Sequence, residues 1–271
     1  AVLDLHTAHG KAAFIKMAAS ADVVIENFRP GTMARFGVGY ETLRVHNSDL
    51  IYCAISGYGQ QGPLAKQPAM DLMIQAISGM MSLTGEPDGR PVKAACPISD
   101  LMGGFAAAFS VLAAVRERDR TGRGRMIDVS MLDVMLTMLG QSVAAYGISG
   151  ETPQRQGNAH QLMAPYQSFR TATREIVISL AIQKRWELLC TLADFAHLLP
   201  REEYRTQPLR NQNRVDLCRE IEEIFMKRPA QYWLAELHRL GLPAAPVNSL
   251  PEILAEPHVA QRGTLMEVEY P

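Results

Sequence analysis

Two acidic side chains, Asp71 and Asp100, stand at the start of apolar helices, where they could act on a carbonyl compound. Asp100 lies in CPISDLMGG, in which Ser99 or Asp100 is expected to cap the helix, and Asp71 lies in QPAMDLMIQ. The partial positive charge of a helix N-terminus keeps such a carboxylate ionised. An ionised, partly desolvated carboxylate can attack a thioester carbonyl and give a mixed anhydride. The alternative is that both acids are plain helix caps.

Two loops could bind a phosphorylated ligand. In the first, ENFRPGTMARFG, residues 27–31 follow an apolar strand, and N–H groups exposed at such a turn suit phosphate oxygens. Arg29 and Arg35 can add charge-assisted bonds, and Phe28 can pack on an adenine ring. The second loop, 57–63 (GYGQQGP), has glycines that allow close backbone approach to a ligand. The alternatives are an ordinary turn with solvated arginines and a flexible surface loop.

The elements that position these residues alternate between strands and helices. Strands are predicted at 22–27, 50–56 and 126–130, and helices at 10–19, 30–36, 40–45, 70–80, 100–117 and 131–148. A further strand is expected at 1–5, with Thr7 capping the first helix. Short apolar strands alternating with helices predict an α/β fold with a mostly parallel sheet.

The C-terminal part of the chain has a different pattern. Residues 147–158 are polar and rich in Gly and Pro, which indicates a linker. Strands at 166–170, 175–180 and 264–270, an extended stretch at 244–248, and helices at 184–193, 213–225, 229–240 and 250–256 follow. This block predicts a smaller α+β domain with Trp186 and Trp233 in its core.

Composition limits the class of protein. The 271 residues are 47% hydrophobic and 20% charged with a net charge of −1, which is typical of a soluble globular protein and does not favour nucleic acid or an anionic membrane. No apolar run of about 18 residues is evident that would span a bilayer. The four cysteines form no CxxC pair, so we expect a reduced, cytoplasmic protein without a metal site.

Taken in order along the chain, these motifs resemble the class III CoA-transferase family, which includes formyl-CoA, carnitine and dicarboxylate CoA-transferases and the α-methylacyl-CoA racemases. The resemblance implies that Asp100 carries the acyl group and that Asp71 assists it. It also implies that Asn27, Phe28 and Arg35 contact CoA, which is a substrate as its thioester, with no other cofactor. Family members have a large Rossmann-like domain and a small domain, and they form interlocked homodimers.

The resemblance also predicts the domain organisation. We expect a large CoA-binding domain at 1–150, a linker and lid loop at 151–160, a small domain at 161–256, and a segment returning to the large domain at 257–271. Full-length members are longer at both ends, so the first βα unit is expected to be missing here. A polypeptide starting at Ala1 is therefore expected to have weak or absent activity and a compromised dimer.

The expected function is transfer of CoA from an acyl-CoA to a small carboxylic acid, with dicarboxylates such as succinate as the first suggestion. Arg155, Arg170 and Arg174 are candidates to bind a second carboxylate. One alternative is an α-methylacyl-CoA racemase or epimerase. Met70 stands where the racemases have a basic His, and a thioether cannot accept a proton; His160 would have to substitute. The other alternative is a catalytically incomplete CoA-binding fragment.

Overall fold

The computed structural model describes residues 2–180 and 182–269, and it has the predicted α/β fold with a parallel sheet. The chain divides into two compact units, Ala1–Gly157 (unit 1) and Asn158–Pro271 (unit 2). Each unit has its own sheet and its own buried core. The candidate acids and both loops predicted to bind a ligand lie in unit 1.

Unit 1 contains a three-stranded parallel sheet in the order β1-β2-β3. Its strands are β1 (Val23–Glu26), β2 (Ile51–Ser56) and β3 (Arg125–Ser130). The register pairs Ile25 with Cys53 and Cys53 with Ile127, so the carboxyl ends of the three strands meet at one edge. These strands confirm the three predicted for this region to within two residues.

Helices cover both faces of this sheet, because the central strand β2 is apolar on both sides. The helices are α1 (Ala8–Ala18), α2 (Thr32–Arg35), α3 (Tyr40–His46), α4 (Asp71–Ile77), α5 (Met80–Leu83), α6 (Ile98–Thr121), α7 (Met131–Met138) and α8 (Gly140–Ser149). Tyr52 and Ala54 pack with α1 and α3 on one face. Cys53 packs with Ala107 of α6 on the other.

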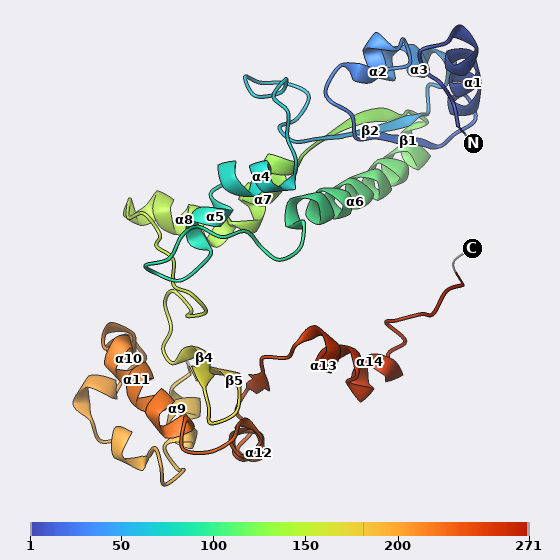
Figure 1. Ribbon diagram of the computed structural model, residues 1–271. Coiled ribbons are helices and arrows are strands. Elements are labelled where there is room, and N and C mark those ends of the chain that lie inside the picture. The colour runs from blue at the N-terminus through green and yellow to red at the C-terminus, as the bar shows by residue number, and fades with distance from the viewer. Residues whose placement is uncertain (1, 181, 270–271) are drawn as a thin grey trace. The chain divides into compact units, whose positions relative to one another are not determined.

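The connection between α6 and β3 sets the direction of α6. Gly122 ends α6 in the left-handed conformation (φ 65°), and β3 begins three residues later. The N–H of Gly124 donates to the carbonyl of Ser48, and a Cβ at Gly124 would lie 2.0 Å from the Leu50 carbonyl oxygen, so only glycine fits this turn. The C-terminus of α6 therefore lies at the amino edge of the sheet, and its N-terminus lies toward the carboxyl edge (Figure 1). Asp100 is in the first turn of this helix.

Helix α6 corrects the expectation that no apolar segment of this chain is long enough to span a bilayer. It is long and apolar enough to span a membrane by length and composition, as is the bent pair α7–α8, whose axes differ by 69°. One side of α6 packs on the sheet through small residues such as Gly103 and Ala107. Phe105, Phe109 and Leu112 are exposed, at 69%, 77% and 68%.

Unit 2 contains an antiparallel sheet with strands β4 (Tyr166–Arg170), β5 (Glu175–Ser179) and β6 (Ala244–Pro246), in that order. Its helices are α9 (Gln183–Leu189), α10 (Gln207–Gln212), α11 (Arg214–Phe225), α12 (Ala230–Arg239), α13 (Leu250–Leu254) and α14 (Pro257–Gln261), with 3-10 turns at Ala196–Leu198 and Glu202–Tyr204. Trp186 and Trp233 are 0% and 1% exposed, which confirms their predicted place in the core.

Several predicted elements differ in the structure. Residues 2–4 and 264–269 form no strand; residues 1 and 270 of those two predictions lie outside the described residues. The helix predicted at 131–148 is two helices that meet at Leu139. The helix predicted at 70–80 ends at Ile77, because Gly79 takes a left-handed conformation (φ 88°) before α5 begins. Thr7 caps α1 as predicted, accepting from the N–H of Gly10.

Candidate active site

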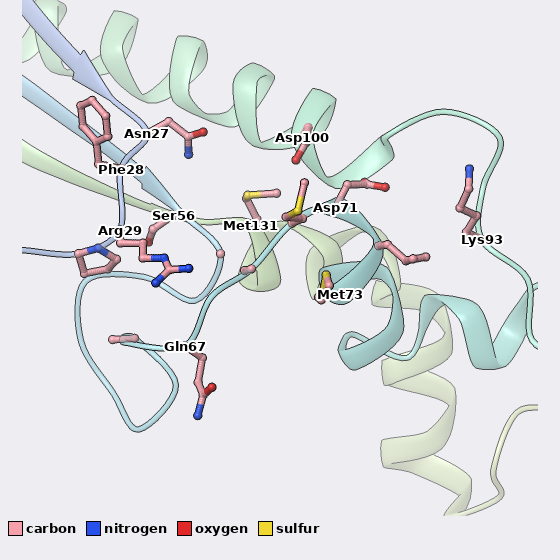
Figure 2. A pocket seen from close by; sticks show the side chains of 16 residues that line it. Asn27, Phe28, Arg29, Ser56, Gln67, Asp71, Met73, Lys93, Asp100 and Met131 are labelled. Atoms are coloured by element: carbon pink, nitrogen blue, oxygen red, sulfur yellow. The ribbon is translucent and has the colours of Figure 1, made fainter. Parts of the chain in front are cut away.

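A pocket of about 570 Å³ lies at the carboxyl edge of the unit 1 sheet. The segments that follow the three strands line it with Asn27–Pro30, Ser56, Gly57 and Met131, and helices α4 and α6 contribute Asp71 and Asp100. In Figure 2, Asn27 to Arg29 lie at one end, Lys93 lies at the other, and the two acids lie between them. Ligands bind at this edge in open parallel sheets, because strand ends and helix N-termini meet there.

Asp100 occupies the third position of α6 and is exposed to the pocket. The helix begins at Ile98 with Pro97 as its N-cap, so the expectation that Ser99 or Asp100 caps it was wrong. Partial burial raises the pKa of the Asp100 carboxyl above its ordinary value, and the negative charge of Asp71 raises it further. Within the described residues the Asp100 carboxylate makes no hydrogen bond, so it is available to react.

Asp71 supplies the acceptor that the start of α6 lacks. Its Oδ1 accepts from the backbone N–H of Ser99 and from the Ser99 hydroxyl, both at 2.9 Å. Its Oδ2 accepts from the side-chain amide of Gln75 at 2.7 Å. Asp71 therefore joins α4 to α6 beside Asp100, and both of its oxygens are already bonded.

Gln75, beside the pocket, and Lys93, in its lining, are residues that sequence reasoning missed. The Gln75 side chain is 0% exposed, and while its amide nitrogen donates to Asp71, its Oε1 accepts from the N–H of Ala94 at 2.9 Å. The sequence contained one signal of the Asp71 contact, because residues four apart share a helix face. The partner Ala94, 19 residues away on the loop leading to α6, could not be predicted from spacing.

The turn after β1 is held by side chains. The carboxylate of Glu26 accepts from the N–H of Phe28 at 2.7 Å, and burial raises the pKa of this carboxyl. The side-chain amide of Asn27 donates to the Ile55 carbonyl at 2.8 Å. The N–H of Phe28 is therefore bonded within the protein and is not one of the N–H groups that this turn can offer to a phosphate.

The structure brings some of the predicted CoA-contacting residues together but not all of them. Asn27 and Phe28 line the pocket, and the Phe28 ring is 49% exposed. The guanidinium of Arg35 donates to the Thr32 hydroxyl at 2.8 Å, and among the described residues lining the pocket it is Arg29, rather than Arg35, that supplies a cation at this turn.

The glycine loop after β2 forms part of the pocket wall through Gly57. The side chain of Asp128 on β3 accepts from the N–H of Gln60 at 2.9 Å and so fixes the loop against the sheet. A Cβ added at Gly57 would lie 2.2 Å from the Cβ of Ala69. The loop and the segment before α4 therefore approach more closely than any larger residue allows.

The arginines proposed for a second carboxylate are engaged elsewhere. Arg155 donates to the carbonyls of Ser82, Glu86 and Gly89, and so ties residue 155 to the loop after α5. In unit 2, Arg170 pairs with Glu222, and Arg174 pairs with Glu252. Lys93 also lines the pocket, and its ammonium donates to the neighbouring carbonyls of Ala94 and Ala95 at 3.1 and 3.5 Å.

His160, suggested as a substitute base, belongs to unit 2. Its ring stacks on Tyr166 with centroids 5.1 Å apart, and its Nδ1 accepts from the N–H of Leu162. Met70, in the pocket lining, is 72% exposed and offers no base.

Comparison with known proteins places this chain in one family. Residues 1–271 match the profile described as CoA-transferase family III. The chain is 39% identical to a succinyl-CoA:mesaconate CoA-transferase of Haloarcula hispanica, with 99% of this chain and 68% of the relative covered. It is 36% identical to a succinate–glutarate CoA-transferase of Agrobacterium fabrum, with 99% and 67% covered.

A solved structure agrees with the sequence relatives. A CAIB/BAIF family protein from Brucella suis superimposes with a TM-score of 0.85 at 36% identity, covering 96% of this chain and 69% of that protein. The chain therefore belongs to CoA-transferase family III, which confirms the resemblance inferred from its motifs. CoA-transferase is accordingly its class of enzyme.

Proposed function

We propose that this protein transfers CoA from an acyl-CoA thioester to a carboxylic acid through covalent intermediates on Asp100. The observation that carries the proposal is the position of Asp100. Its carboxylate is exposed to a pocket and makes no hydrogen bond within the described residues, while both oxygens of the neighbouring acid Asp71 are bonded. Chemical trapping of an activated Asp100 carboxyl, described in the Discussion, tests it.

The first half of the reaction forms and then opens an anhydride. A carboxylate oxygen of Asp100 attacks the thioester carbonyl carbon, the C–S bond breaks, and CoA leaves as the thiolate. That thiolate attacks the Asp100 carbonyl carbon of the anhydride, and the donor acid leaves as its carboxylate. Asp100 then carries CoA as a thioester, with no net proton transfer.

The second half repeats these steps in reverse with another acid. The acceptor carboxylate attacks the Asp100 thioester and displaces CoA thiolate, which gives a new anhydride. The thiolate attacks the acceptor carbonyl carbon, the product acyl-CoA leaves, and Asp100 is regenerated. The partial positive charge at the N-terminus of α6 stabilises the negative charge that develops in each step.

The nucleotide end of CoA is assigned to the turn after β1. The exposed Phe28 ring offers a stacking surface, and Arg29 offers a cation to phosphate. Asn27 supports the turn through its bond to Ile55, and Arg35 is assigned to phosphates that extend beyond the pocket. No other cofactor is required by these steps.

We propose small dicarboxylic acids as the exchanged acids, because relatives of this chain are named for succinate, mesaconate and glutarate. A second carboxylate in a pocket that already holds Asp71 and Asp100 needs a cation to offset the repulsion. Lys93 lies at the opposite end of the pocket from the CoA turn, which suits it to this role (Figure 2).

Replacing Lys93 by Met should therefore raise the KM for succinate on the order of 10-fold, as expected for one charge-assisted contact, with a smaller change in kcat. Transfer to butyrate, which lacks the second carboxylate, should change little. The control Lys66→Met alters an exposed lysine between two residues of the pocket wall. Equal losses with succinate and butyrate would remove this role from Lys93.

The raised pKa of Asp100 predicts the pH dependence of acylation. Because only the ionised carboxylate attacks, acylation is lost on acidification through this pKa, at a higher pH than for an ordinary aspartate. Asp71→Asn removes the negative charge that raises the pKa of Asp100 further. The pH at which acylation is lost should therefore fall, whatever the substitution does to the maximal rate. Single-turnover acylation rates across the acidic and neutral pH range measure this effect. If the midpoint of the pH profile is the same in Asp71→Asn and the wild type, Asp71 does not raise the pKa of Asp100.

We also propose that the protein acts as a homodimer in the cytoplasm. The exposed apolar side of α6, formed by Leu101, Phe105, Phe109 and Leu112, supports an association that covers it, since soluble proteins rarely leave such patches open. The four cysteines are free, as expected for a reducing compartment.

A further inference from the structure

Gln75 is a fully buried polar side chain beside the candidate active site, and both ends of its amide are bonded to segments that position Asp100. The nitrogen donates to Asp71, and the oxygen accepts from the N–H of Ala94, at 2.7 and 2.9 Å. Burying an amide costs free energy unless its groups are bonded, so the position favours a residue that can both donate and accept.

The bonds continue on the far side of Asp71. Its second oxygen holds the N–H and hydroxyl of Ser99, a residue that is itself 0% exposed and directly precedes Asp100. Hydrogen bonds therefore run from Ala94 through Gln75 and Asp71 to Ser99. Together with the backbone of residues 94–99 they form a closed ring, which fixes both ends of the segment that leads into α6. Helix α6 has no side-chain bond from its own N-cap, so this ring takes the place of one.

We propose that Gln75 is a positioning residue for CoA transfer: it holds Asp71 in the orientation that anchors the start of α6 and so aims the Asp100 carboxylate at the thioester. The inference rests on the proposed role of Asp100 as nucleophile. It adds a residue that touches no substrate, because Gln75 does not line the pocket and is inaccessible to solvent.

Substitutions at position 75 can remove one of these two hydrogen bonds or both. Gln75→Glu keeps an oxygen for the Ala94 N–H but replaces the donor facing Asp71 with a carboxylate, and two carboxylates in contact repel. Protonation of the introduced carboxyl restores a donor to Asp71. Gln75→Leu removes both bonds at every pH and leaves Asp71 and the Ala94 N–H without these partners.

The charged groups around position 75 are few. Asp71 lies on its own helix, Asp100 comes from α6, and Lys93 comes from the loop before α6. Helix α5 carries no titratable side chain, and α7 carries only Asp133. A pH response present in Gln75→Glu and absent in Gln75→Leu is therefore assigned to the introduced carboxyl.

The test compares kcat, KM for succinyl-CoA and the rate of Asp100 acylation in the wild type, Gln75→Glu and Gln75→Leu, from mildly acidic to mildly alkaline pH. At the alkaline end we expect kcat to fall on the order of 100-fold in both variants, as for a small misplacement of a reacting group, with KM nearly unchanged. The ratio of Gln75→Glu to wild-type kcat should rise as the pH falls, whereas the Gln75→Leu ratio should stay low.

Gln141→Glu, the same substitution at an exposed position in the first turn of α8, serves as the control and should match the wild type. Melting curves identify a variant that fails to fold, and if Gln75→Leu does so, the pH response of Gln75→Glu decides alone. A Gln75→Glu ratio that is independent of pH, or a kcat equal to that of the wild type, would overturn the inference. A wild type whose Asp100 is never acylated would instead overturn the proposed function.

Discussion

Replacing Asp100 by Asn should abolish CoA transfer, with a loss on the order of 10⁴-fold or more in kcat, because the amide cannot act as the nucleophile. Asn is nearly isosteric with Asp and leaves the bonds between Asp71 and Ser99 intact. The affinity for CoA, measured by calorimetry, should therefore change by less than about threefold, which is under about 1 kcal/mol. A loss of turnover with retained binding separates chemistry from recognition.

Asp133→Asn is a matched control for this variant. Asp133 occupies the third position of α7, as Asp100 does in α6, and it lies outside the residues that line the pocket. Removing its charge should cost about 0.3–1 kcal/mol of stability through the helix dipole and leave turnover unchanged. An Asp100→Asn enzyme with the activity of Asp133→Asn would show that the acyl group is carried elsewhere.

Gly57→Ala should also have a large effect, because it adds a methyl group where the side chains of Ala69 and Ile74 already fill the space. The new Cβ would lie 2.2 Å from the Cβ of Ala69 and 3.3 Å from Cδ1 of Ile74, which is 0% exposed. The segment that leads into α4 must move, and with it Asp71. Overpacking of this kind costs about 1–3 kcal/mol, and we expect kcat/KM to fall on the order of 100-fold.

Thermal melting and steady-state kinetics measure both effects. Gly147→Ala provides the comparison, since residue 147 lies inside α8 and a Cβ there meets nothing within 4 Å. This control should gain about 0.5–1 kcal/mol, because alanine favours the helix. If Gly57→Ala melts and turns over like the wild type, the close approach of the glycine loop to α4 does not matter for function.

The sequence predicted the parts of unit 1 that depend on local pattern. The strands β1 and β2 are short, largely apolar runs, β3 follows the glycine turn at the end of α6, and a parallel sheet follows from the helices between them. The break at Leu139 was missed because residues 131–148 are largely apolar throughout. The end of α4 was missed because a single glycine, Gly79, terminates it with a positive φ.

The candidate site was predicted in its acids but not in the bonds that connect them. Asp71 and Asp100 are far apart in the chain, and no local pattern indicated that one bonds the start of the helix that carries the other. Gln75 was missed because a glutamine on an apolar helix is ordinarily expected to be exposed, and only the fold brings Ala94 to it. Side-chain bonds between distant segments depend on tertiary structure, which spacing alone cannot supply.

Asp100 is the residue on which the proposed covalent transfer depends. The decisive measurement is mass spectrometry of the protein after brief incubation with succinyl-CoA and hydroxylamine, which converts an activated carboxyl to a hydroxamate. We predict a stable mass change confined to the peptide that carries Asp100 and absent from Asp100→Asn. An unmodified Asp100 with succinyl-CoA and several other acyl-CoAs, especially with exchange of the substrate α-hydrogen in deuterated water, would contradict the account and favour racemisation.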